Sequence, residues 1–85
     1  MKTRRYGQEE LAFGKGLRIL MEREELNISE VADWSGVEKQ TIREICRSSR
    51  RPYEGTKRMI AAVFRMTVEE VEAVGWSSEA AEAEG

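Results

Sequence analysis

The chain has 85 residues, with one cysteine, no histidine and a formal net charge of −2 at neutral pH. This length suits one small domain with a single core, and it excludes a deep catalytic cleft supported by a separate scaffold. One cysteine cannot form an intramolecular disulfide, and a zinc site lacks its usual histidine and paired-cysteine ligands. With no histidine for general-base chemistry and no Gly-rich loop after a strand, we expect a protein that is not an enzyme and needs no metal or cofactor.

Charge and hydropathy are unevenly distributed along the chain. Residues 1–23 carry +3, residues 24–38 carry −5, residues 39–58 carry +5 and residues 59–85 carry −5. The basic central segment is therefore more informative than the total charge. The longest apolar run, residues 59–64, is too short to span a bilayer, and the first residues lack the apolar core of a signal peptide. We expect a soluble cytoplasmic protein without membrane contact.

A first helix is predicted over residues 8–24, after a basic stretch at residues 1–7 that is either a frayed terminus or a flexible arm. Four apolar side chains share one face of this helix: Phe13, Leu17, Leu20 and Met21. Gly14 and Gly16 weaken it by about 1 kcal/mol each relative to alanine. They would be tolerated where another backbone packs closely, or where the helix begins later. Glu25 ends the helix where glycine would be the easier residue, so we expect an irregular corner.

Residues 27–47 contain two short helical patterns joined by a tight corner. Asn27 can cap the first, and Glu30, three residues on, completes a capping-box pattern. Gly36 supplies the positive φ that a sharp turn between helices needs. The second pattern, residues 39–47, buries Ile42, Ile45 and Cys46. Its outer face carries Lys39, Gln40, Arg43, Glu44 and Arg47. Two helices of this length, one with an outward row of cations and an amide, describe a helix-turn-helix.

A loop of turn formers and cations follows at residues 48–53. Pro52 marks the break, because it disfavours helix at Arg51. A fourth helix is predicted over residues 54–65. Its buried face is expected to contain Met59, Ile60, Val63 and Phe64.

A short fifth helix is predicted between Thr67, which caps it, and Gly75, which ends it. Glu70 lies at the capping-box spacing from Thr67. The apolar positions of this helix are Val68, Val71 and Val74. Residues 77–85 are acidic and low in complexity, so a disordered tail is predicted. With no strand alternation along the chain, the fold class is all-α.

Two motifs in these helices occur together. The first is Phe13-Gly14-x-x-Leu17-Arg18-x-Leu20, and the second is Val31-Ala32-x-x-Ser35-Gly36-Val37-x-x-x-Thr41-Ile42-x-x-Ile45. They resemble the signatures of the lambda-repressor-like helix-turn-helix domains, also called the Cro or XRE type. The resemblance covers residues 13–71 without an insertion. It implies a five-helix DNA-binding domain over residues 8–76, with the helix-turn-helix at the second and third helices.

The resemblance also implies a function, namely a sequence-specific regulator of transcription. Such a chain would act as a repressor and homodimer that binds a two-fold operator on double-stranded DNA. The family's base-reading positions match Lys39, Gln40, Arg43 and Glu44. Its phosphate-contacting positions match Asn27, Arg47, Ser49, Arg50 and Arg51. The basic arm of some members matches Lys2, Arg4 and Arg5. Dimer contacts through the fifth helix would involve Val68, Val71, Val74 and Trp76.

Four positions depart from the family pattern. Ile28 stands where a glutamine usually supports DNA contact, and Glu38 replaces the usual serine or threonine cap of the third helix. Many members have a buried Arg–Glu ion pair where this chain has Met21 and Cys46. Replacing both partners of a buried pair by apolar groups is often neutral or stabilising. We therefore predict that Met21 touches Cys46, with the cysteine acting as a small buried hydrophobe.

A second function class stays open, namely an antitoxin-like or adaptor module whose main partner is a protein. Its partner would be met through Trp34, which the pattern places toward solvent, or through residues 71–76. Trp34 could equally lie over the acidic helix surface, and Trp76 could cap the core. The cations of the third helix could form only a solvated face. Four further cations nearby favour DNA contact instead: Arg50, Arg51, Lys57 and Arg58.

Overall fold

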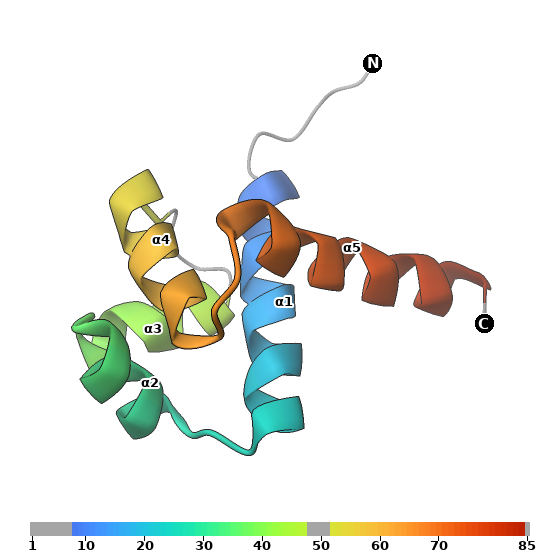
Figure 1. Ribbon diagram of the computed structural model, residues 1–85. Helices are drawn as coiled ribbons and strands as arrows, with labels where there is room; N and C mark the ends of the chain where they lie inside the picture. Colours follow the sequence, from blue (N-terminus) through green and yellow to red (C-terminus); the bar gives the residue numbers. More distant parts are fainter. Residues whose placement is uncertain (1–7, 48–51, 85) are drawn as a thin grey trace.

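The computed structural model describes residues 8–47 and 52–84, with side chains for residues 12–47 and 52–77, and within these ranges it contains five helices and no strand. The helices are α1 (Gln8–Glu24), α2 (Ile28–Ser35), α3 (Lys39–Cys46), α4 (Glu54–Val63) and α5 (Val68–Glu84). Helices α2, α3 and α4 lie together on one side of α1, and α5 leads away on the other side (Figure 1). For the described residues, the prediction of an all-α fold class with five helices is confirmed.

Two helices end at residues that are not glycine but adopt a left-handed backbone. After α1, Glu25 has φ 58°, and the Leu26 N–H donates to the Met21 carbonyl at 2.8 Å. After α4, Arg65 has φ 59°, and the Met66 N–H donates to the Ala61 carbonyl at 3.1 Å. Both bonds belong to a Schellman arrangement, which normally favours glycine at the left-handed position. The irregular corner predicted at Glu25 is therefore confirmed.

The predicted ends of α3 and α4 need small corrections. Helix α3 ends at Cys46, so Arg47 is its cap rather than its last residue. Helix α4 ends at Val63, two residues before the predicted end. Its apolar periodicity continues past this point because Phe64 still packs against the core from the corner. The apolar pattern alone therefore placed the end of α4 two residues too late.

The corner between α2 and α3 forms as predicted. Asn27 Oδ1 accepts from the Glu30 N–H at 2.8 Å, and the Asn27 N–H donates to Glu30 Oε1 at 2.9 Å. At the other end of α2, Gly36 has φ 81° and its N–H donates to the Ala32 carbonyl at 2.9 Å. The capping box and the left-handed glycine thus fix where α2 begins and where the chain turns into α3.

Among the described helices, α1 and α5 share the most extensive contact, and two glycines allow their backbones to approach closely. A methyl group on Gly16 would overlap the Val71 carbonyl oxygen, and one on Gly75 would overlap the Ala12 carbonyl oxygen. The prediction that Gly75 ends the fifth helix is wrong, because this glycine is a contact point inside α5 rather than a cap. The helix continues to Glu84 through the segment predicted to be a disordered tail, whose alanines and glutamates are strong helix formers.

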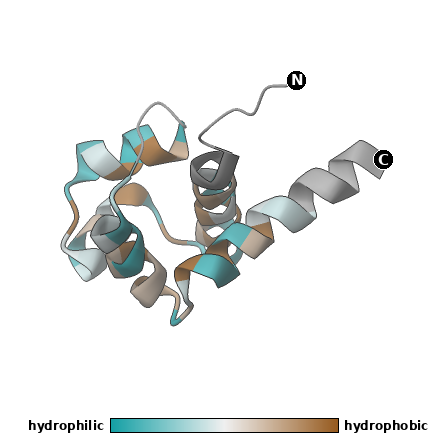
Figure 2. Ribbon diagram, turned by 90° about the horizontal axis from the view of Figure 1, so that it is seen from above, coloured by the Kyte–Doolittle hydropathy of each residue, from teal (hydrophilic) through white to brown (hydrophobic). Residues whose placement is uncertain are grey.

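The core draws side chains from all five helices. Its largest fully buried members are Phe13, Leu17, Val31, Ile42, Ile45, Ile60 and Val71. Apolar and hydrophilic segments alternate along the helices, as one-sided packing requires (Figure 2). Met59 was expected in the core but is 45% exposed, because α4 turns Lys57, Ile60 and Ala61 inward instead.

Met21 and Cys46 both adjoin this core. Cys46 is a buried member of it, as expected, and the partly buried Met21 packs against the same cluster. Direct contact between the two side chains stays a prediction. Among the helices of residues 8–47 and 52–84, none combines the length and apolar character that crossing a bilayer requires.

Candidate nucleic-acid interface

Helix α3 presents the row of polar side chains that the sequence singles out. Its apolar face, with Ile42, Ile45 and Cys46, is buried against the core, and α3 contacts both α1 and α2. The opposite face is directed to solvent. Exposed there are Lys39, Gln40, Arg43 and Arg47, with Glu44 partly exposed. The structure thus brings together the predicted base-reading residues on one face of one short helix.

Three of these side chains form a hydrogen-bonded row. Arg43 Nη1 donates to Gln40 Oε1 at 3.0 Å, and Gln40 Nε2 donates to Glu44 Oε2 at 3.0 Å. Residues three and four apart on a helix are neighbours, so each contact spans one turn. The amide of Gln40 therefore lies between a cation and an anion, each of which is bonded to the amide atom of suitable polarity.

The cations of α3 are spaced one turn apart. Lys39, Arg43 and Arg47 follow one another at four-residue intervals, so their charges form a row along the helix. Glu44 lies beside this row, and Glu38 stands at its beginning. A polyanion approaching α3 would meet three cations and two anions, a weak positive surface.

Glu38 is the cap residue of α3, with φ −63° and ψ 145°. Within the described residues its exposed side chain makes no capping hydrogen bond. The nearest capping-type contact precedes it, where the Val37 N–H donates to Ser35 Oγ at 3.1 Å. The carboxylate is favourable beside the positive end of the helix but repels a phosphate at the same place. This departure from the family pattern weakens an anion site at the start of α3.

Asn27 was predicted to contact a phosphate at the beginning of α2. Its side-chain oxygen is occupied by the capping box, and the carboxylate of Glu30 already accepts its backbone N–H. A phosphate would therefore compete with a carboxylate that belongs to the chain itself. The other predicted contacts, at Lys2, Arg4, Arg5, Ser49, Arg50 and Arg51, lie outside the described residues.

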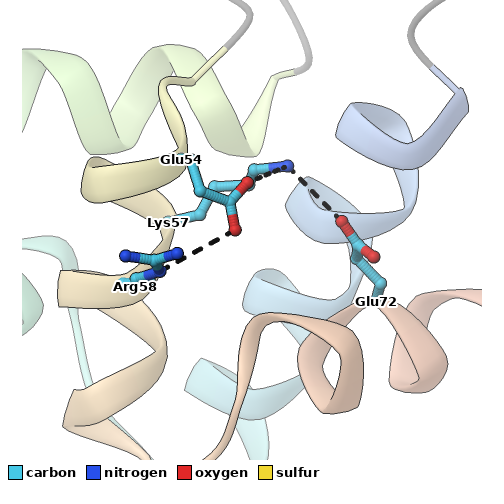
Figure 3. A network of polar contacts seen from close by, with 4 residues as sticks. All are labelled: Glu54, Lys57, Arg58 and Glu72. Carbon is cyan, nitrogen blue, oxygen red and sulfur yellow. Dashed lines mark hydrogen bonds and ion pairs between the residues drawn. The ribbon is translucent and has the colours of Figure 1, made fainter.

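Lys57 does not belong to the basic surface, contrary to the sequence interpretation. It is only 7% exposed, and its Nζ lies 3.5 Å from Glu72 Oε2 and 3.8 Å from Glu54 Oε1 (Figure 3). The same ammonium stands 6.0 Å from the centroid of the Phe13 ring. The expected cationic surface therefore lacks one of its members. Local spacing could not reveal this, because Glu72 lies in a different helix.

Two of the four residues predicted to form dimer contacts on α5 have little or no exposed surface. Val71 is fully buried and Val68 nearly so within a single chain, because this face of α5 packs on the core. Val74 also packs against the core, although it is only partly buried. Trp76 is the one member of the set that is strongly accessible, with 42% of its surface exposed.

Aromatic side chains on two other surfaces lie beside hollows. Trp34 is 64% exposed, which confirms the expected orientation toward solvent. It borders a hollow of about 280 Å³, whose other lining residues are Glu24, Leu26, Val63, Phe64 and Arg65. Tyr53, which the sequence interpretation overlooked, is also exposed and lines a second hollow with Met59 and the α2–α3 corner. A loop residue such as Tyr53 has no periodicity that could predict its exposure.

The remaining candidate for chemistry is Cys46. Burial raises the pKa of its thiol, and the charge of Arg18 partly opposes this effect. A raised pKa keeps the thiol protonated and unreactive at neutral pH. Among the described residues there is no cluster of three or more potential metal ligands.

Comparison with models of known families, with curated proteins and with solved structures gave no match to this chain.

Proposed function

We propose that the chain is a sequence-specific DNA-binding regulator of the lambda-repressor-like type, with α2 and α3 as its helix-turn-helix. One observation carries this proposal, namely that α3 buries its apolar face and exposes Lys39, Gln40 and Arg43 together. An α3 of eight residues is about 12 Å long. With its side chains, an α-helix is about 10–12 Å in diameter, which fits the width of the major groove, about 12 Å.

The geometry before α3 supports the same function. The left-handed Gly36 provides the abrupt turn that separates a supporting helix from a recognition helix. Contacts of α3 with α1 and α2 hold it as a rigid element, and base recognition needs side chains on a rigid support. In this proposal α2 crosses the DNA backbone, and α3 enters the groove.

A repressor of this type would bind a two-fold operator as a homodimer. With Val68 and Val71 inside the core, the second copy would be met by Trp76 and the outer part of α5. Trp76 combines a large apolar surface with substantial exposure, and tryptophan is favoured at interfaces. Sedimentation of the wild-type chain and of Trp76→Ala tests this part of the proposal.

The test of DNA binding is the salt dependence of duplex affinity for the full chain. Affinity should fall steeply as salt rises, since each cation–phosphate contact releases counterions. Lys39→Ala and Arg43→Ala should weaken binding while far-ultraviolet circular dichroism stays unchanged. Arg65→Asn is the matched control, because it removes one cation near Trp34 rather than on α3 and asparagine tolerates the left-handed backbone. Binding that is insensitive to both α3 variants and to salt would refute the proposal.

One observation favours a second candidate, an adaptor or antitoxin-like module that binds a protein. Trp34 stands 64% exposed beside a hollow whose lining combines apolar residues such as Leu26 and Phe64 with the charged Glu24 and Arg65. Exposed aromatic residues beside such hollows are typical of interaction sites. For this function Trp34→Ala would abolish activity in the host, and Lys39→Ala and Arg43→Ala would leave it intact. The DNA-binding proposal predicts the reverse outcome.

A further inference from the structure

The side-chain amide of Gln40 is held in one orientation by two charged neighbours. Its Oε1 accepts from Arg43 Nη1 and its Nε2 donates to Glu44 Oε2, both at 3.0 Å. A flipped amide would place its NH₂ group against the guanidinium and its oxygen against the carboxylate, so both contacts would become repulsive. The opposite charges of Arg43 and Glu44 therefore select a single amide orientation.

This orientation is unsuited to reading a base. A glutamine recognises adenine when its oxygen and nitrogen both point outward, toward N6 and N7 of the base. In Gln40 both atoms are directed to the next turn of α3. Contact with adenine through the N–H and the lone pair that face Glu44 and Arg43 would require the loss of both bonds, each of which is made to a charged group.

Arg43, in contrast, stays available for a base. A guanidinium has five N–H donors in a planar fork, and the bond to Gln40 uses the Nη1 group of Arg43. The side chain is exposed, so its other donors can reach O6 and N7 of a guanine. The bond to Gln40 also restricts the rotamers of this long side chain, which lowers the entropy lost on binding.

We propose that Gln40 is a positioning residue rather than a base reader, and that Arg43, held by Gln40, directs α3 to guanine. Glu44 fixes the Gln40 amide, so the three residues act as one unit with a single reading group. This inference rests on the proposed DNA-binding function and specifies the base that the same site recognises.

The experiment selects bound sites from random duplex DNA with the full chain and four variants. Wild type should enrich a guanine at one position of each half-site, and Arg43→Ala should lose that preference. Gln40→Ala should keep guanine at the position while its discrimination over adenine falls by about tenfold. Gln40→Ala should have no further effect on that position in the Arg43→Ala background, because Gln40 acts through Arg43.

A paired exchange separates positioning from simple loss of structure. The double variant Gln40→Glu/Glu44→Gln exchanges the amide and the carboxylate, so Arg43 keeps an acceptor and the exchanged pair keeps its hydrogen bond. It should restore guanine discrimination to within about threefold of wild type. An adenine preference that Gln40→Ala removes would overturn this inference while leaving DNA binding intact. A wild-type chain that enriches no sequence would overturn the proposed function and this inference together.

Discussion

Lys57 on α4 and Glu72 on α5 form an interior ion pair, with 3.5 Å between Nζ and Oε2. Both side chains are largely buried, and the ammonium also faces the ring of Phe13 on α1. Three helices thus meet around one positive charge. A cation that the sequence suggested for the surface is instead part of the packing between helices, so its loss should affect stability directly.

We expect Glu72→Gln to lower the free energy of unfolding by about 2–3 kcal/mol, because the buried ammonium loses its closest charged partner. Urea unfolding measures the change. Arg58→Ala is the control, since its pair with Glu54 is exposed and 4.0 Å long, and should contribute less than about 0.5 kcal/mol. Lys57→Met combined with Glu72→Leu should recover most of the loss, because apolar replacement of both partners is often neutral. Equal losses for the Glu72 and Arg58 variants would contradict a structural role of the pair.

Gly16→Ala should destabilise the fold by about 3 kcal/mol or more, because the new methyl group would overlap the Val71 carbonyl and force α1 and α5 apart. Gly75→Ala should cost about as much for the corresponding clash with Ala12. Gly55→Ala serves as the matched control. Apart from its chain neighbours and the nearby backbone of α4, no described atom lies within 4 Å of a methyl group at Gly55, so alanine there should stabilise α4 by up to about 1 kcal/mol. If thermal unfolding showed Gly16→Ala and Gly75→Ala to be as stable as Gly55→Ala, the close approach of α1 and α5 would be excluded.

Glu38→Ser should improve both stability and DNA affinity. Serine can accept an N–H of the first turn of α3, which typically adds about 1 kcal/mol, whereas Glu38 makes no such bond among the described residues. The substitution also removes a carboxylate that would repel a phosphate beside this end of α3. Unfolding and duplex titration at one fixed salt concentration measure the two effects. Greater stability without tighter binding would show that DNA phosphates do not approach this end of α3.

Cys46 predicts a specific dependence of stability on pH. Its thiol pKa is raised above the ordinary value of 9.0 by burial, so the folded state holds the proton more tightly than the unfolded state. This contribution is complete below the unfolded pKa and is lost as pH rises through the folded pKa. Wild type should therefore lose stability relative to Cys46→Ala above about pH 9, and the difference should be constant below about pH 8. A constant difference across the whole range would mean that the thiol is solvated when folded.

Local patterns predicted most of the helices, because their determinants are a few residues apart. Asn27 with Glu30, and Thr67 with Glu70, form their capping boxes within one turn, and both are present in the structure. The left-handed backbone at Gly36 was likewise predictable, because a sharp turn between two helices needs a positive φ at that position. The exposed row of α3 was predictable for the same reason, since Ile42 and Ile45 fix which face is buried.

Long-range packing accounts for the errors. Lys57 was placed on the surface because its partner Glu72 belongs to another helix, and no spacing within α4 indicates that contact. Gly75 was interpreted as a helix end because glycine usually has that role, whereas here it allows the backbone of α1 to approach. The bonds of Gln40 are local instead: the helical spacing makes Arg43 and Glu44 its neighbours, but spacing alone does not give the orientation of the amide between them.

The close approach of α1 and α5 at Gly16 and Gly75 also constrains the order of assembly. It joins α1 and α5, so a nascent chain still lacking α5 cannot cover the surface of α1 that α5 later occupies. Closing so long a loop is an entropic cost that must precede the gain from packing. We expect α5 docking to be the late step of folding, with Gly75→Ala accelerating unfolding far more than it slows refolding. A ribosome-bound intermediate without α5 would then be the species most in need of a chaperone.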